Sequence, residues 1–83
     1  MSLGIRFLNS TKFLSIGIDQ RLKFWSIDNE RNCLELKKNF LVDIRDILSM
    51  DRIFFSRKNR FVILIAGAGV QTIEFDLTNS SFF

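Results

Sequence analysis

The sequence contains no histidine and no proline, and its single cysteine is Cys33. Without histidine, this chain cannot build a Ser-His-Asp or Cys-His catalytic arrangement from its own residues. One cysteine excludes an internal disulfide, and a lone thiol with only carboxylates beside it is a poor basis for a structural zinc site. We expect no catalytic residue, no metal and no cofactor. Cys33, which has no activating base near it in the sequence, is expected to be a buried or inert thiol.

The sequence also lacks a long apolar run. Its longest stretch without charge, residues 61–73, includes two glycines and a glutamine, and a spanning helix needs about 20 apolar residues. The first residues lack the apolar core of a signal peptide. We therefore expect no membrane segment and a cytoplasmic protein. The net charge of +3 is too small to indicate nucleic-acid binding by itself.

What the sequence does contain is apolar residues in short runs. Hydrophobic residues make up 47% of the 83 residues and ten are phenylalanine, a content that excludes a disordered segment. Polar or glycine-containing breaks separate the runs, which is typical of β-strands. The strands that this pattern predicts cover residues 3–8, 12–16, 21–27, 33–37, 61–66 and 70–77.

Residues 42–60 are harder to interpret. Residues 42–50 alternate as a strand would, but Ile44, Ile47 and Leu48 also have the i, i+3, i+4 spacing of a helix. We favour the strand, because it fits the repeat described next. Residues 51–60 hold a short apolar patch followed by basic residues, and we expect a long loop there.

Two similar units follow each other in the chain. Residues 12–17 are followed by 21–25, and residues 61–67 are followed by 71–76. Trp25 and Phe75 occupy matching positions, 75 − 25 = 50 residues apart. A WD40 blade spans about 40–45 residues, so the second unit needs extra length, which the predicted loop at 51–60 supplies.

Residues 14–25 resemble the second strand, turn and third strand of a WD40 blade. That family places a small hydroxyl residue on the second strand, an aspartate in the turn and an aromatic residue at the end of the third strand, and Ser15, Asp19 and Trp25 match these positions. The aspartate caps turn amides, and the indole N–H donates to the hydroxyl. The family's histidine has no counterpart here. In the second unit glycines replace the turn aspartate, and Phe75 replaces the tryptophan.

The resemblance implies an all-β fold of about two antiparallel WD40-type propeller blades, at residues 1–41 and 42–83. The last blade is expected to lack its outer strand, because little chain follows Leu77. The chain would then be a fragment of a larger propeller.

A narrower resemblance covers residues 13–76. The segments 18–25, 42–46 and 66–74 are similar to the C-terminal repeats of the WD-repeat subunits that accompany the methyltransferase of the tRNA wobble-nucleotide 2′-O ribose. This resemblance implies a non-catalytic scaffold whose protein partner is a tRNA 2′-O-methyltransferase, with tRNA contacted at most indirectly.

Other functions stay open at this point. The chain could serve as a WD40 protein-interaction module in an unrelated pathway, such as trafficking or signalling, or be a truncated fragment without function. A small β-barrel that binds nucleic acid or acts as an enzyme is a third alternative. Four basic residues are candidates for contact with tRNA phosphates or a partner, although a solvated loop explains them equally well: Arg52, Arg57, Lys58 and Arg60. Asp43 and Asp46 have no sign of the pocket that a catalytic carboxylate pair requires.

Overall fold

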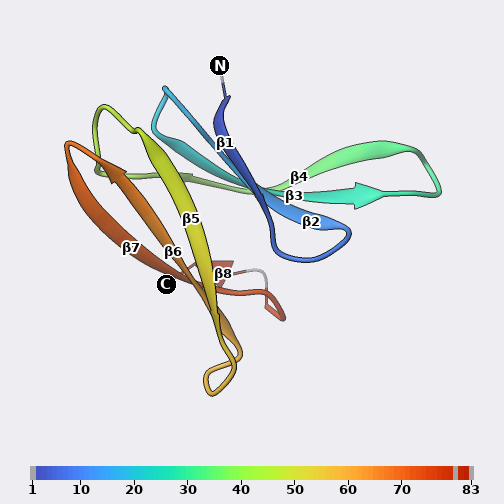
Figure 1. Ribbon diagram of the computed structural model, residues 1–83. Coiled ribbons are helices and arrows are strands. Elements are labelled where there is room, and N and C mark those ends of the chain that lie inside the picture. The colour runs from blue at the N-terminus through green and yellow to red at the C-terminus, as the bar shows by residue number, and fades with distance from the viewer. Residues whose placement is uncertain (1, 80, 83) are drawn as a thin grey trace.

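The computed structural model describes residues 2–79 and 81–82, and within these ranges every regular element is a β-strand (Figure 1). The strands form two four-stranded antiparallel sheets, with the orders β1-β2-β3-β4 and β5-β6-β7-β8. The all-β class is thereby confirmed. The strands of the first sheet are β1 (Ser2–Phe7), β2 (Lys12–Gly17), β3 (Arg21–Asp28) and β4 (Cys33–Leu41). Those of the second sheet are β5 (Ser49–Phe55), β6 (Arg60–Gly67), β7 (Gly69–Asp76) and β8 (Ser81–Phe82).

Side-chain oxygens early in the connections fix several of the hairpin turns. In four connections an Asn or Asp accepts hydrogen bonds from backbone N–H groups two or three residues later, which is the usual reason that these residues favour turns. The accepting residues are Asn9, Asp19, Asp28 and Asp76. Short polar segments therefore reverse the chain within a few residues and keep consecutive strands adjacent.

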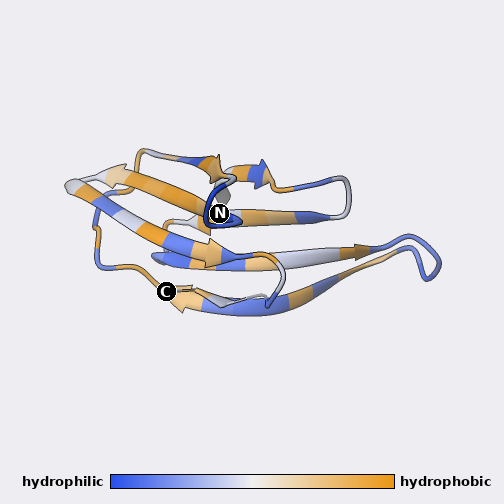
Figure 2. Cartoon of the chain, turned by 90° about the horizontal axis from the view of Figure 1, so that it is seen from below, coloured by the Kyte–Doolittle hydropathy of each residue, from blue (hydrophilic) through white to orange (hydrophobic). Residues whose placement is uncertain are grey.

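The core lies between the two sheets, which pack face to face (Figure 2). Alternate residues of each strand point to the same side, so one face of the first sheet buries Leu14, Ile16, Leu22 and Phe24. The facing surface of the second sheet buries Phe61, Ile63, Ile65, Ile73 and Phe75. The rings of Phe24 and Phe75 meet at a centroid distance of 4.7 Å. These two faces are called the inner faces below.

Residues 42–48 form an irregular connecting segment, so the predicted strand over 42–50 is wrong for most of its length. The side-chain amide of Gln20 donates to the carbonyls of Val42 and Ile44, both at 3.1 Å. These two carbonyls thus bond to a side chain instead of a neighbouring strand. Val42 and Ile47 are buried, whereas Leu48 is 80% exposed, so the helix-like spacing of Ile44, Ile47 and Leu48 does not mark one buried face.

The predicted long loop at 51–60 is also wrong. Residues 49–55 are β5, paired along its length with β6, and only residues 56–59 form the turn between them. Ile53 and Phe54 lie opposite Val62 and Phe61, so the apolar patch belongs to a strand. The 50-residue spacing from Trp25 to Phe75 instead includes the nine-residue β4 and the connecting segment.

The second sheet does have an outer strand, in contrast to the expectation that it lacks one, but β8 is only two residues long. The carboxylate of Asp76 accepts from the amides of Thr78 and Asn79 and reverses the chain there. Phe82 then pairs with Phe75, and their rings lie 4.8 Å apart. The two-residue β8 completes the sheet because the ring of Phe82 packs against the core.

The two sheets meet through non-equivalent faces. β1 and β5 lie side by side and run in the same direction (Figure 1), so the two sheets, which have the same strand order, meet through opposite sides. Phe61 and Phe75 lie on the second sheet's inner face. Phe13 and Trp25 alternate with the buried Leu14 and Phe24, so they point away from the second sheet. Each sheet therefore meets the other through a different face, and this packing is called head to tail below.

Candidate partner-binding surface

Ser15, Asp19 and Trp25 make two separate contacts in the first sheet. Nε1 of Trp25 on β3 donates to Oγ of Ser15 on β2 at 2.9 Å. Oδ1 of Asp19 accepts from the backbone N–H of Arg21 at 3.1 Å and fixes the turn between these strands. The side chain of Asp19 is exposed, and Ser15 and Trp25 are half-buried. All three residues act within one hairpin, as side chains that hold its geometry.

The four basic candidates do not form one patch. Arg52 lies where the sheets adjoin, and its Nε donates to the carbonyl of Phe7 at 3.0 Å. Lys58 and Arg60 instead approach Glu74, at 3.5 and 3.0 Å. Arg57 is exposed in the turn after β5. The structure thus brings Lys58 and Arg60 together, places Arg52 elsewhere and pairs much of this charge with carboxylates.

Glu74 is the carboxylate that two of these cations share. The hydrogen bond from the Arg60 guanidinium is the main reason that the pKa of Glu74 lies below its ordinary value, and the charge of Lys58 adds to the effect. A phosphate ligand would have to compete with this carboxylate for both cations. The arrangement therefore favours a structural role for Lys58 and Arg60.

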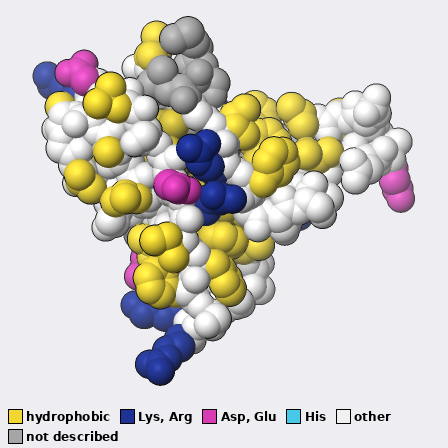
Figure 3. Space-filling model, viewed as in Figure 1, with side chains coloured by type: hydrophobic (Ala, Val, Ile, Leu, Met, Phe, Trp, Pro, Cys, Tyr) yellow, Lys and Arg dark blue, Asp and Glu magenta, His cyan; other side chains and the backbone are white. Residues whose placement is uncertain are grey.

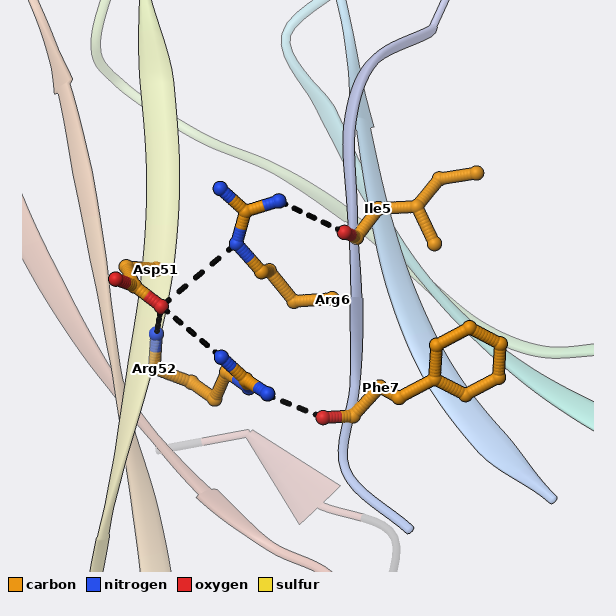
Figure 4. Close-up of polar contacts among 5 residues, drawn as sticks. All are labelled: Ile5, Arg6, Phe7, Asp51 and Arg52. Carbon is orange, nitrogen blue, oxygen red and sulfur yellow. Dashed lines mark hydrogen bonds and ion pairs between the residues drawn. The ribbon is translucent and has the colours of Figure 1, made fainter. Parts of the chain in front are cut away.

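A polar contact that the sequence does not reveal links the two sheets at their edge strands β1 and β5 (Figure 4). Nε of Arg6 lies 3.7 Å from Oδ1 of Asp51, and Nη1 of Arg52 lies 3.2 Å from the same oxygen. The pKa of Asp51 is lowered, first by the backbone N–H of Arg52 and then by the side chain of Arg52. Because these groups are exposed, their contribution to stability is small, but they fix how the edges meet.

One feature with a capacity to bind is apolar. The side of the first sheet that faces away from the second sheet, here the first outer face, carries side chains from all four strands: Ile5, Phe7, Phe13, Trp25, Leu34 and Leu36. The rings of Phe7 and Phe13 lie 5.3 Å apart, and those of Phe13 and Trp25 stack at 6.1 Å. Phe7 is 50% exposed and Leu34 is 59% exposed. A continuous aromatic and aliphatic surface of this kind marks an interaction site.

The first outer face is hollowed at its middle. A shallow, open depression there is lined by Ile5, Phe13, Ser15, Lys23, Trp25 and Leu34, among others. Its lining is mostly apolar, and its polar members are Ser15, Asp19, Arg21 and Lys23. Figure 3 shows hydrophobic side chains at the surface over both sheets, on either side of a small central group of basic and acidic side chains. This surface can bury a complementary apolar face.

The remaining sequence candidates lie apart from this surface. Asp43 and Asp46 are exposed in the connecting segment, where the Asp43 amide donates to the side chain of Gln71 at 3.0 Å. Cys33 is exposed at the start of β4 rather than buried. Within residues 2–79 and 81–82, no group of three His, Cys, Asp or Glu side chains could hold a metal ion. The same part of the chain contains no helix long and apolar enough to cross a membrane.

Comparison with known proteins gives no match to a protein-family model, a curated protein or a solved structure. The resemblance to WD-repeat proteins therefore stays a prediction from the sequence. The face-to-face sheets, the Ser15–Trp25 hydrogen bond and the exposed first outer face are the observations from which a function can be argued.

Proposed function

We propose that this chain is a non-catalytic scaffold of the WD-repeat type, which binds a protein partner and contributes no reacting group of its own. The observation that carries the proposal is the arrangement of two four-stranded antiparallel sheets, packed face to face with β1 beside β5. The Ser15–Trp25 hydrogen bond supports it, since it joins the two residue types that the resemblance pairs. Repeated sheets of this kind serve as rigid platforms for other proteins.

The partner that we propose is a tRNA 2′-O-methyltransferase, on the strength of the sequence resemblance over residues 13–76. In this proposal the enzyme holds the methyl donor and the ribose, and the scaffold acts in the cytoplasm. Contact between this chain and tRNA is proposed to be indirect. The pairing of Lys58 and Arg60 with Glu74 supports that, because it lowers the positive charge offered to phosphates.

The test is a binding and activity measurement with purified components. The chain is titrated with a wobble-nucleotide 2′-O-methyltransferase by calorimetry, and methyl transfer to tRNA is measured with and without the chain. We expect a saturable complex, faster methylation in the presence of the chain and no methyl transfer by the chain alone. Methyl transfer by the isolated chain, or the absence of any complex with the enzyme, would contradict the proposal.

The second candidate is a protein-binding module of an unrelated pathway. The exposed first outer face favours it, because an apolar face does not specify a methyltransferase as its partner. An affinity purification that recovers a defined complex lacking any methyltransferase would support this candidate. If the isolated chain instead binds RNA with an affinity that falls steeply with salt, the nucleic-acid-binding alternative would replace both.

A further inference from the structure

Each sheet is apolar on both of its faces, but only one face of each is covered. The first outer face leaves half of the Phe7 side chain exposed. The side of the second sheet that points away from the first, here the second outer face, carries Ile53, Phe55, Val62, Leu64 and Val70. Ile53 is 60% exposed and Val70 is 67% exposed. Within residues 2–79 and 81–82, each sheet thus retains one apolar face that the other sheet does not cover.

The head-to-tail arrangement specifies what would fit these faces. Because β1 and β5 lie side by side and run in the same direction (Figure 1), a rotation that places the first sheet on the second brings the first outer face to the position of the second sheet's inner face. The same rotation brings the inner face of the first sheet to the position of the second outer face. The two uncovered faces are therefore the counterparts of the two faces that pack together inside the chain.

Charge disfavours pairing two first outer faces with each other. By strand register, this face includes Arg21 and Lys23, with the carboxylate of Asp19 beside them in the depression. The second outer face adds no uncompensated positive charge of this kind, because its carboxylates Asp51 and Glu74 are already paired with basic side chains. Two first outer faces packed against each other would bring Arg21 and Lys23 of both copies onto one interface.

We infer that the occupant of the first outer face is the second outer face of another copy of this chain. The contact repeats between copies the packing that already exists between the two sheets, and it buries both uncovered apolar faces. Such a heterologous contact closes into a ring if the rotation allows and otherwise extends as a chain. Propellers contain about 4–8 blades, so a closed ring with two sheets per copy would hold about two to four copies. The inference goes beyond the scaffold proposed above, because it requires no enzyme and no RNA.

The experiment measures mass by size-exclusion chromatography with light scattering over a range of concentrations, on the whole 83-residue chain. We expect the wild-type mass to rise above the 9.7 kDa of one chain as concentration increases. Phe7→Lys disables the first outer face and Leu64→Lys the second. Leu48→Lys is the matched control, since Leu48 is 80% exposed in the connecting segment, away from both faces. Placing a lysine in a packed apolar interface is expected to weaken association about tenfold or more.

Mixing the two variants gives the decisive measurement. In a head-to-tail contact each variant keeps one intact face, so Phe7→Lys and Leu64→Lys are each monomeric alone but form a 1:1 complex when mixed. If Leu64→Lys associates as strongly as the wild type while Phe7→Lys does not, identical faces pair and the inference is wrong. A wild-type chain that remains monomeric at every concentration also overturns it.

Folding of each variant is checked first by circular dichroism, and Leu34→Lys and Ile53→Lys replace any variant that fails. Binding of the methyltransferase is measured on the same variants. If the enzyme binds the wild-type monomer and Phe7→Lys abolishes that complex, the first outer face belongs to the enzyme and the inference fails while the proposed function stands.

Discussion

Gly67 offers a sharp test of how the connecting segment is held. It is the last residue of β6, and it lies under the backbone of residues 45 and 46. A Cβ atom at this position would be 2.6 Å from the carbonyl oxygens of both Arg45 and Asp46. Two backbone hydrogen bonds join the same regions, from Ala68 N–H to Arg45 O and from Leu48 N–H to Ala66 O, both at 2.8 Å. The substitution Gly67→Ala therefore forces backbone against backbone.

Two opposing effects determine the size of the change. Overpacking that shifts the backbone costs about 1–3 kcal/mol, while replacing glycine by alanine restricts the unfolded chain and returns about 0.4–1 kcal/mol. The positive φ in this turn belongs to Gly69, so Gly67 is constrained by space and not by its dihedral angle. We expect a net loss of about 1–2 kcal/mol in the free energy of unfolding. For a domain of this size, each kcal/mol lowers Tm by roughly 4–8 °C.

Urea denaturation followed by the fluorescence of Trp25, the single tryptophan, measures this loss. Gly4→Ala is the matched control, because its Cβ would lie 3.7 Å from the Ile16 side chain, an ordinary contact. Both variants are compared at one protein concentration, since association also changes apparent stability. If Gly67→Ala is as stable as Gly4→Ala, the backbone of residues 45 and 46 moves aside with little loss of unfolding free energy. The close packing against Gly67 is then not a constraint on the fold.

Three further predictions follow from single contacts. A double-mutant cycle with Ser15→Ala and Trp25→Phe should give a coupling of about 0.5–1.5 kcal/mol in unfolding free energy, as for one hydrogen bond; additive effects would show that the contact does not stabilise the fold. The folded-state pKa of Glu74 is depressed, so its contribution is present above the unfolded pKa and is lost as pH falls through the folded pKa. Glu74→Gln should accordingly flatten the acid side of the stability–pH profile, and an unchanged profile would contradict the pairing with Arg60. Gln20→Asn keeps a residue that tolerates the positive φ of 62° but shortens the side chain, so its amide no longer reaches both carbonyls. The free energy of unfolding should fall by about 1–2 kcal/mol. Hydrogen exchange should then show faster opening of residues 42–48, and unchanged exchange would refute the anchoring role.

The parts of the fold that the sequence predicts are those fixed by neighbours in the chain. Six predicted runs correspond to β1–β4, β6 and β7, because alternation and turn residues act over a few positions. The predictions for residues 42–60 are wrong because the conformation of this segment depends on groups distant in the sequence. The side chain of Gln20 accounts for the irregular backbone after Val42. Pairing with β6 turns the residues around Ile53 from a predicted loop into a strand.

The features of the candidate surface also divide into those fixed by neighbours in the chain and those fixed by distant residues. The positions of Ser15, Asp19 and Trp25 within one hairpin could be read from local spacing. The contact of Arg6 with Asp51 could not, since it joins residues 45 positions apart only after two sheets have packed. Alternation shows that a strand has two faces but does not say which one will be covered. For this reason the exposure of Phe7 and Leu34 became visible only in the assembled sheets.

Stability and association are linked in a molecule built this way. A chain of 83 residues buries a limited core, and here two sheets share a single inner interface. Stacked repeats bury a continuous core only when neighbours cover both faces, and about three or more are usually needed for stability. A second copy placed on the first outer face would supply the third and fourth sheets, burying Phe7 and Leu34 as Phe24 and Phe75 are already buried. The contact within the chain and the contact inferred between chains would then be two instances of one packing arrangement.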